Sequence, residues 1–112
     1  MSRDSVYLLD ILLKAAKLAI GYLKGKSRKE FLKDTQCQDA VIRRLEIIGE
    51  AARRISRTTA AKFPNIPWTK VRAMRNIIVH EYDDVDLAIV WNTVRSDLPS
   101  LISLSDQQSD VL

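Results

Sequence analysis

The residues best suited to do chemistry in this chain lie in one short segment, residues 75–82. Arg75, Asn76 and His80 combine a permanent cation, an amide and an imidazole, and Tyr82 adds a phenolic hydroxyl. An imidazole titrates near neutral pH, so it can take or give a proton under physiological conditions. A guanidinium forms bidentate hydrogen bonds with phosphate oxygens and stabilises negative charge that develops on them. Together these side chains predict acid–base chemistry at a phosphate group.

Cleavage of an RNA phosphodiester would use this set most completely. A 2′-hydroxyl that attacks its neighbouring phosphate must lose a proton, and the leaving oxygen must gain one. His80 can serve either step, Arg75 can hold the charged phosphorane, and Asn76 can orient the imidazole or bind a phosphate oxygen. The sequence has one His, one Cys and carboxylates without the spacing of metal ligands, so we expect a metal-independent reaction without a cofactor.

The same residues also fit a purely structural role. His80 near the end of a helix would interact favourably with the helix dipole, and Arg75 could pair with an acidic neighbour. On an ideal helix Arg72, Asn76 and His80 share one stripe, whereas Arg75 and His80 point about 140° apart. Tyr82, just past the helix end, is also typical of a half-buried packing residue with a hydrated hydroxyl. Spacing alone therefore leaves catalysis and structure open as alternatives.

The elements that must position this segment are helical. Apolar residues recur at helical spacing over about residues 4–24, 27–34, 35–57, 67–79 and from 86 onward, and no strand pattern is convincing. The near-heptad stripe of the third segment indicates shallow crossing angles. We predict an all-α, up-and-down bundle of four to five helices over residues 1–104, with a flexible tail over 105–112. The first helix is apolar on two sides, which indicates a central position or contact with a second subunit.

Several residues mark where these helices should begin and end. Ser27 and Glu30 have the spacing of a capping box, and the segment that opens at Thr35 repeats that form. A loop is expected over residues 58–67, with Pro67 at the first position of the next helix. Pro99 should kink the last helix or restart its final turn.

Composition excludes several classes of protein. Of 112 residues, 46% are hydrophobic and 29% charged, which is typical of a globular domain. The apolar runs are too short to span a bilayer, and no secretory signal pattern opens the chain. Cys37 is the one cysteine, and we expect it to be a small half-buried residue rather than a nucleophile. A lone cysteine fits a reducing compartment, so the expected location is the cytoplasm.

Charge is distributed unevenly along the chain. Residues 1–62 carry 14 Lys and Arg against 7 Asp and Glu, whereas residues 63–112 carry 4 against 7. One face of the third helix and the start of the motif helix carry the candidate RNA-binding arginines: Arg43, Arg53, Arg54, Arg57 and Arg72. This face could bind RNA phosphates. It could equally be an ordinary solvated surface in which Glu50 pairs with the arginines three and four positions later.

The chain resembles a known family along nearly its whole length. The motifs that carry the resemblance are Ile66-Pro67-Trp68, the stretch Met74-Arg75-Asn76-Ile77-Ile78-Val79-His80-Glu81-Tyr82, Val90-Trp91, Asp97-Leu98-Pro99 and the preceding helix Arg44-Leu45-Glu46-Ile47-Ile48-Gly49-Glu50-Ala51-Ala52. These are similar to the HepT-like family of HEPN domains. The pattern Arg-x4-His-x-Tyr is short, but its place after Pro-Trp and before a Trp-bearing last helix makes the match specific.

The resemblance implies a function that composition could not supply. HepT-like proteins are toxins of toxin–antitoxin pairs, form helical dimers and are regarded as metal-independent ribonucleases. Their motif residues correspond to Arg75, Asn76 and His80. The partner is a minimal nucleotidyltransferase antitoxin that can silence the toxin by transferring AMP to the motif tyrosine, here Tyr82. The resemblance thus implies RNA as substrate and a homodimer as the working form.

Two other functions remain open. The chain could be a non-catalytic module that binds RNA, a nucleotide or a nucleotidyltransferase partner through the same segment, or it could be a dimerisation module. Trp68 and Trp91 are expected to be core residues rather than platforms for base stacking.

Overall fold

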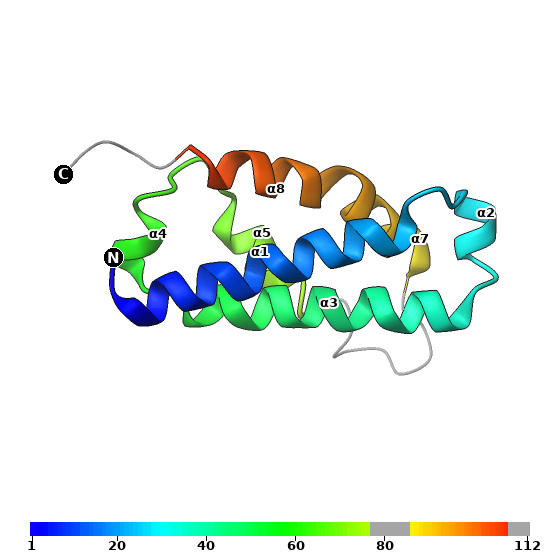
Figure 1. Ribbon diagram of the computed structural model, residues 1–112, viewed down its shortest axis with the longest axis horizontal. Helices are drawn as coiled ribbons and strands as arrows, with labels where there is room; N and C mark the ends of the chain where they lie inside the picture. The colour runs from blue at the N-terminus through cyan, green and yellow to red at the C-terminus, as the bar shows by residue number, and fades with distance from the viewer. Residues whose placement is uncertain (77–85, 108–112) are drawn as a thin grey trace.

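Helices form every regular element that the computed structural model describes, which covers residues 1–76 and 86–107. Two long helices, α1 (Arg3–Leu23) and α3 (Thr35–Arg54), pack side by side and run in opposite directions. The last helix, α8 (Leu98–Ser105), lies along the other side of α1 (Figure 1). The predicted all-α bundle is therefore confirmed, and α1 occupies the central position expected of a helix that is apolar on two sides.

The core lies in the seam between α1 and α3. The near-heptad stripe predicted on α3 is buried throughout: Val41, Leu45, Ile48, Ala52 and Ile55. Leu12 and Ala16 of α1 are also almost fully buried. Each fully buried Leu or Ile side chain contributes roughly 1.5–3 kcal/mol, so this seam is the main support of the fold. Val6, Tyr7 and Leu18 on α1 remain exposed.

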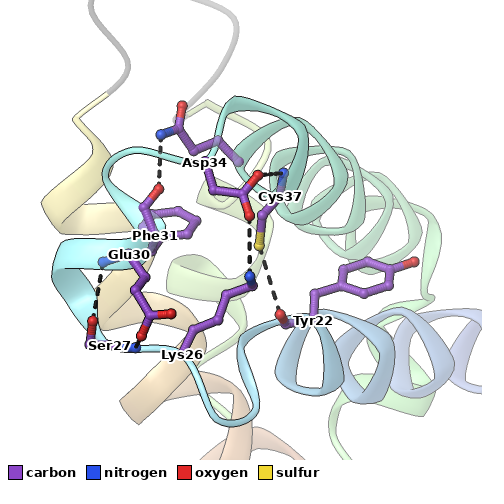
Figure 2. A network of polar contacts seen from close by, with 8 residues as sticks. Tyr22, Lys26, Ser27, Glu30, Phe31, Asp34 and Cys37 are labelled. Carbon is purple, nitrogen blue, oxygen red and sulfur yellow. Dashed lines mark hydrogen bonds and ion pairs between the residues drawn. The ribbon is translucent and has the colours of Figure 1, made fainter.

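A short helix, α2 (Arg28–Phe31), turns the chain from α1 into α3. The predicted capping box is present, since the Glu30 backbone N–H donates to Ser27 Oγ and the Ser27 N–H donates to Glu30 Oε1 (Figure 2). The expected cap at the start of α3 was wrong by one residue. Asp34 is the N-cap, and its Oδ1 accepts from the Cys37 N–H at 3.0 Å.

Asp34 also pairs with Lys26, whose Nζ lies 3.1 Å from Oδ2 (Figure 2). The N–H of Cys37 and the ammonium of Lys26 hold the pKa of Asp34 below its ordinary value. Cys37 was expected to be half-buried and is in fact buried, with Sγ 3.7 Å from the carbonyl oxygen of Tyr22. Burial raises the pKa of its thiol, so Cys37 is a packing residue and not an activated nucleophile.

The third helix ends earlier than predicted. It was expected to reach residue 57 and to be followed by a loop, but α3 stops at Arg54 and Ile55 is extended. Ser56 then caps a further short helix, α4 (Arg57–Ala60), by accepting from the Thr59 N–H. The extended backbone at Ile55 keeps its side chain in the core, while Ser56 offers a cap that favours a new helix start. Arg57 therefore lies on α4, not on α3.

The helical segment predicted from about residue 86 begins there. Asp86 caps α7 (Leu87–Asn92), and its Oδ1 accepts from the N–H groups of Ala88 and Ile89. A π-helical turn, η1 (Thr93–Asp97), then joins α7 to α8. Pro99 lies at the start of α8 and lacks the N–H that would bond one turn back. The predicted disturbance at Pro99 thus takes the form of a widened turn just before it.

α8 ends at Ser105, and most of the tail predicted over residues 105–112 lies outside the described part of the chain. Among the described residues, no helix combines the length and the apolar character needed to cross a bilayer.

Candidate active site

Arg75 lies two residues after the end of the short helix α5 (Trp68–Ala73). Pro67 was predicted at the first position of this helix, but it is the N-cap residue of α5, one position earlier. The helix was expected to continue to residue 79, but Met74 and Arg75 form a turn, in which the Met74 N–H donates to the Val71 carbonyl at 3.1 Å. This i to i−3 bond tightens the end of α5. The ideal helical wheel therefore does not describe how Arg75 is oriented.

The backbone of Arg75 lies against Gly49 in α3. A Cβ atom placed on Gly49 would be 2.5 Å from the Arg75 backbone nitrogen and 2.8 Å from the Arg75 Cβ. It would also be 3.1 Å from the carbonyl oxygen of Arg72. The first two separations are shorter than Cβ atoms in folded proteins show, so the absence of a side chain at Gly49 is what allows the turn after α5 to lie on α3.

The side chain of Arg75 reaches Glu50, the residue after Gly49. Arg75 Nε lies 3.4 Å from Glu50 Oε2, with about a third of the Arg75 side chain and half of the Glu50 side chain exposed (34% and 54%). The pair engages Nε, whereas the two terminal nitrogens carry the remaining donors of the guanidinium. Those nitrogens form the edge that can bind a phosphate in bidentate fashion.

Arg75 lines a groove of about 370 Å³ between α1, α3 and the end of α5. The apolar part of its lining comes from Leu8, Ile11, Ile47 and Ala51. Its charged part consists of three arginines and two glutamates: Arg43, Arg54, Arg75, Glu46 and Glu50. Arg43 and Glu46 form an ion pair on this face. The groove, which we call the arginine groove, thus offers guanidinium groups beside an aliphatic surface.

Helical geometry explains which arginines of α3 enter the groove. Arg43 and Arg54 are eleven residues apart, close to three full turns, so they point to the same side. Arg53 is exposed but points about 100° away from Arg54 and does not line the groove. Glu50, expected to pair with its helix neighbours, instead pairs with Arg75. The candidate basic ridge is therefore divided between two faces of α3.

The other candidate arginines lie elsewhere. The Arg72 guanidinium lies over the Trp68 ring, 5.9 Å from its centroid. Arg57 is exposed on α4. Neither residue lines the arginine groove, so the structure brings together Arg43, Arg54 and Arg75 but not the whole predicted set.

Asn76 is exposed and does not line the groove. His80 and Tyr82 lie outside the described residues. Their predicted roles as proton-transfer group and modification site have no described geometry.

Both tryptophans are packing residues, as predicted. Trp68 Nε1 donates to the carbonyl oxygens of Ala60 and Phe63 at 3.1 and 3.2 Å. Trp91 packs on Phe31, with ring centroids 5.6 Å apart. Both side chains are partly buried against the core.

Gly49 is the site residue that the sequence interpretation missed. A glycine in the middle of an otherwise regular helix costs about 0.5–1 kcal/mol relative to alanine, and this was the available signal. Leu8 and Ile11 were also missed as groove residues, because contacts between distant segments have no local pattern. Within the described ranges, no three residues among His, Cys, Asp and Glu are grouped as a metal site.

The ribonuclease HepT-like family matches residues 12–107, which is most of the chain. This chain belongs to that family. A relative from Methanocaldococcus jannaschii, named provisionally as an RNase, is 40% identical over 103 residues, or 90% of this chain and 94% of the relative. A protein of Thermococcus cleftensis, named as a probable ribonuclease HepT, is 38% identical and covers 90% of this chain and 92% of its own. The resemblance inferred from the motifs is confirmed.

A third relative comes from Caldanaerobacter subterraneus subsp. tengcongensis and is also named provisionally as an RNase. It is 34% identical over 93 residues, which is 83% of each chain. No solved structure gives a significant match. The HepT-like match spans α3, the segment that carries Arg75 and every residue of the arginine groove except Leu8 and Ile11.

Proposed function

We propose that this HepT-like protein is a metal-independent endoribonuclease that cleaves RNA with Arg75 and His80. The observation that carries the proposal is the position of Arg75 in the arginine groove, beside Arg43 and Arg54. Membership of a family described as ribonucleases supports the same reaction. The groove carries three guanidinium groups against the two carboxylates of Glu46 and Glu50, and this excess of positive charge suits a chain of phosphates better than a neutral ligand.

The chemistry follows from the residue types. The 2′-oxygen of one nucleotide attacks the adjacent phosphorus and gives up its proton, and the 5′-oxygen of the next nucleotide leaves with a proton. The products are a 2′,3′-cyclic phosphate and a 5′-hydroxyl. Arg75 stabilises the phosphorane charge through its terminal nitrogens, His80 transfers protons, and Asn76 orients the imidazole or binds a phosphate oxygen.

In this proposal, the affinity for RNA comes mainly from Arg43 and Arg54, which line the groove. Arg53, Arg57 and Arg72 lie outside the groove and contribute further contacts. All are predicted phosphate contacts. Their contribution should weaken as salt rises, because cations bound to RNA phosphates are released on binding.

The working form we propose is a homodimer with the two Arg75–His80 segments near the two-fold axis. Acid–base cleavage works best with two proton-transfer groups, and each chain has one His. Val6 and Tyr7 are 50% and 65% exposed on the N-terminal half of α1. That half of α1 also supplies Leu8 and Ile11 to the groove, so contact there would bring two grooves close together.

We further propose that the protein is a toxin controlled by a minimal nucleotidyltransferase antitoxin in the cytoplasm. This part rests on the family resemblance. AMP attached to the Tyr82 hydroxyl would add a bulky anion near the phosphate-binding residues, where it would block RNA and compete for Arg75.

A second candidate function is a non-catalytic module that binds RNA, a nucleotide or a nucleotidyltransferase through the same surface. The Arg75–Glu50 ion pair favours it, since a paired guanidinium is also a common structural feature of a surface. Incubation with RNA in chelator separates the two. The first function requires cleavage that Arg75→Ala abolishes, whereas the second requires binding without cleavage.

Control by the partner has its own experiment. Wild type and Tyr82→Phe are incubated with the cognate nucleotidyltransferase, ATP and magnesium, and intact masses are compared. We expect added AMP on wild type and none on the variant, which should remain toxic. Equal modification of both proteins would show that AMP is attached to a residue other than Tyr82.

A further inference from the structure

Gly49 occupies an unusual place for a glycine. It lies within the 20-residue helix α3, where glycine is unfavourable because its backbone loses more freedom than that of alanine. Its backbone conformation does not demand glycine, since Gly25 is the glycine with positive φ and Gly49 is not. The reason for glycine at this position must therefore be space.

The space is filled by the backbone at Arg75. A Cβ on Gly49 would meet the Arg75 nitrogen at 2.5 Å and the Arg75 Cβ at 2.8 Å. Such atoms cannot rotate away as the tip of a long side chain can. Any side chain at position 49 must therefore push the turn after α5 away from α3 and carry Arg75 with it.

Glu50, the residue after Gly49, contacts the side chain of Arg75 at the groove. The backbone of Arg75 rests on Gly49, and its Nε meets the carboxylate of the next residue at 3.4 Å. Adjacent residues of one rigid helix thus meet both the main chain and the side chain of Arg75. The Glu50 carboxylate thus lies at ion-pair distance from the Nε side of the Arg75 guanidinium at the groove wall.

We propose that Gly49 is a positioning residue for Arg75, which sets the distance of Arg75 from α3, while Glu50 sets the direction of its guanidinium. This inference rests on the proposed role of Arg75 in RNA cleavage. Transition-state stabilisation depends on placement, and a displacement of about 1 Å can lower a rate about 100-fold. Binding of RNA through several exposed arginines tolerates such a displacement much better.

The test compares Gly49→Ala with Gly21→Ala. Gly21 lies within α1, and a Cβ there would meet nothing within 4 Å, so this variant is a matched control for replacing a helical glycine. Single-turnover cleavage at saturating RNA gives the rate, fluorescence anisotropy gives the Kd for RNA, and circular dichroism gives the fold. We expect Gly49→Ala to lower the rate about 10- to 100-fold with a Kd within about twofold. Gly21→Ala should match wild type.

Nuclear magnetic resonance reports directly on the position of the Arg75 side chain, which a general loss of stability would not change. The Nε–Hε signal of Arg75, assigned by its loss in Arg75→Ala, should shift in Gly49→Ala and in Glu50→Gln and stay unchanged in Gly21→Ala. If Gly49→Ala alone does not fold, it is measured together with Gly21→Ala, which restores helix propensity in α1. Glu50→Gln, an exposed change, tests the side-chain contact independently.

Wild-type cleavage and an unshifted Arg75 signal in Gly49→Ala would overturn the inference. So would a slower rate with an unshifted signal, because Gly49 would then act by another route. Failure of the proposed function looks different. In that case Arg75→Ala would cleave RNA like wild type, while the Arg75 signal in Gly49→Ala would still report whether Gly49 positions the residue.

Discussion

Arg75 and Glu50 form an ion pair at the edge of the arginine groove, with Nε and Oε2 3.4 Å apart. Glu50 lies in α3 and Arg75 in the turn after α5, and the contact exists because Gly49 lets that turn lie on α3. An exposed pair of this kind contributes roughly 0.2–1 kcal/mol. Its main effect should therefore be on the orientation of Arg75, not on the stability of the bundle.

Glu50→Gln should leave the free energy of unfolding within about 1 kcal/mol of wild type. If the lost orientation costs up to about 1 kcal/mol in the transition state, RNA cleavage should fall about two- to fivefold. Denaturant unfolding and single-turnover cleavage measure the two effects. Asp10→Asn, which removes an equal charge from an exposed position on α1 outside the groove, is the control. Equal rates for all three proteins would remove Glu50 from the site.

Arg54→Ala should weaken RNA binding more than Arg53→Ala. Arg54 lines the arginine groove and Arg53 does not, so these neighbours form a matched pair with the same charge change. Each lost phosphate contact should reduce the slope of log K against log salt by about 0.7 for single-stranded RNA. Titration at several salt concentrations measures both slopes. A larger effect of Arg53→Ala would place the RNA path on the other face of α3.

Disruption of the proposed dimer should follow from a charge on the exposed face of α1. Tyr7 is 65% exposed in the monomer, so a lysine there should leave the fold intact. Its ammonium group should raise the Kd of the dimer at least about tenfold. Analytical ultracentrifugation at micromolar concentration gives the result. Leu32→Lys, at a 45% exposed residue after α2, is the control. A wild-type protein that sediments as a monomer would contradict the dimer.

The stability of the protein should fall in acid partly through Asp34. Its pKa lies below the ordinary value of 3.8, chiefly because it accepts the N–H of Cys37 at the start of α3. A lowered folded-state pKa means that the contribution is complete above the unfolded value and is lost as pH falls through the folded value. Asp34→Asn should therefore lower Tm at neutral pH and reduce the acid-dependent loss of Tm below about pH 4. An unchanged acid dependence would remove Asp34 from this role.

The sequence predicted the elements whose signals are local. The buried stripe of α3, the capping box of Ser27 and the start of α7 at Asp86 all follow from periodicity or from a side chain that caps its own helix. The end of α3 was wrong because Ser56 opens α4 and Ile55 remains buried in an extended conformation. Tertiary packing there outweighs the continuation of a helical pattern.

The candidate site was predictable in its residue types but not in its arrangement. Arg75 could be selected from its chemistry and from the family motif. Its contact with Gly49 and its pairing with Glu50 join segments more than twenty residues apart along the chain, and no local pattern specifies such contacts. The division of Arg53 and Arg54 between two faces follows from helical geometry once the groove is known.

The central claim is that Arg75 and His80 cleave RNA without a metal. Its most direct test is single-turnover cleavage of a single-stranded RNA in chelator by wild type and His80→Ala, with identification of the product ends. We predict that wild type cleaves the RNA to a 2′,3′-cyclic phosphate and a 5′-hydroxyl. For a folded His80→Ala we predict a cleavage rate that is lower by a factor of about 100 or more. Equal rates for the two proteins in chelator would contradict the account.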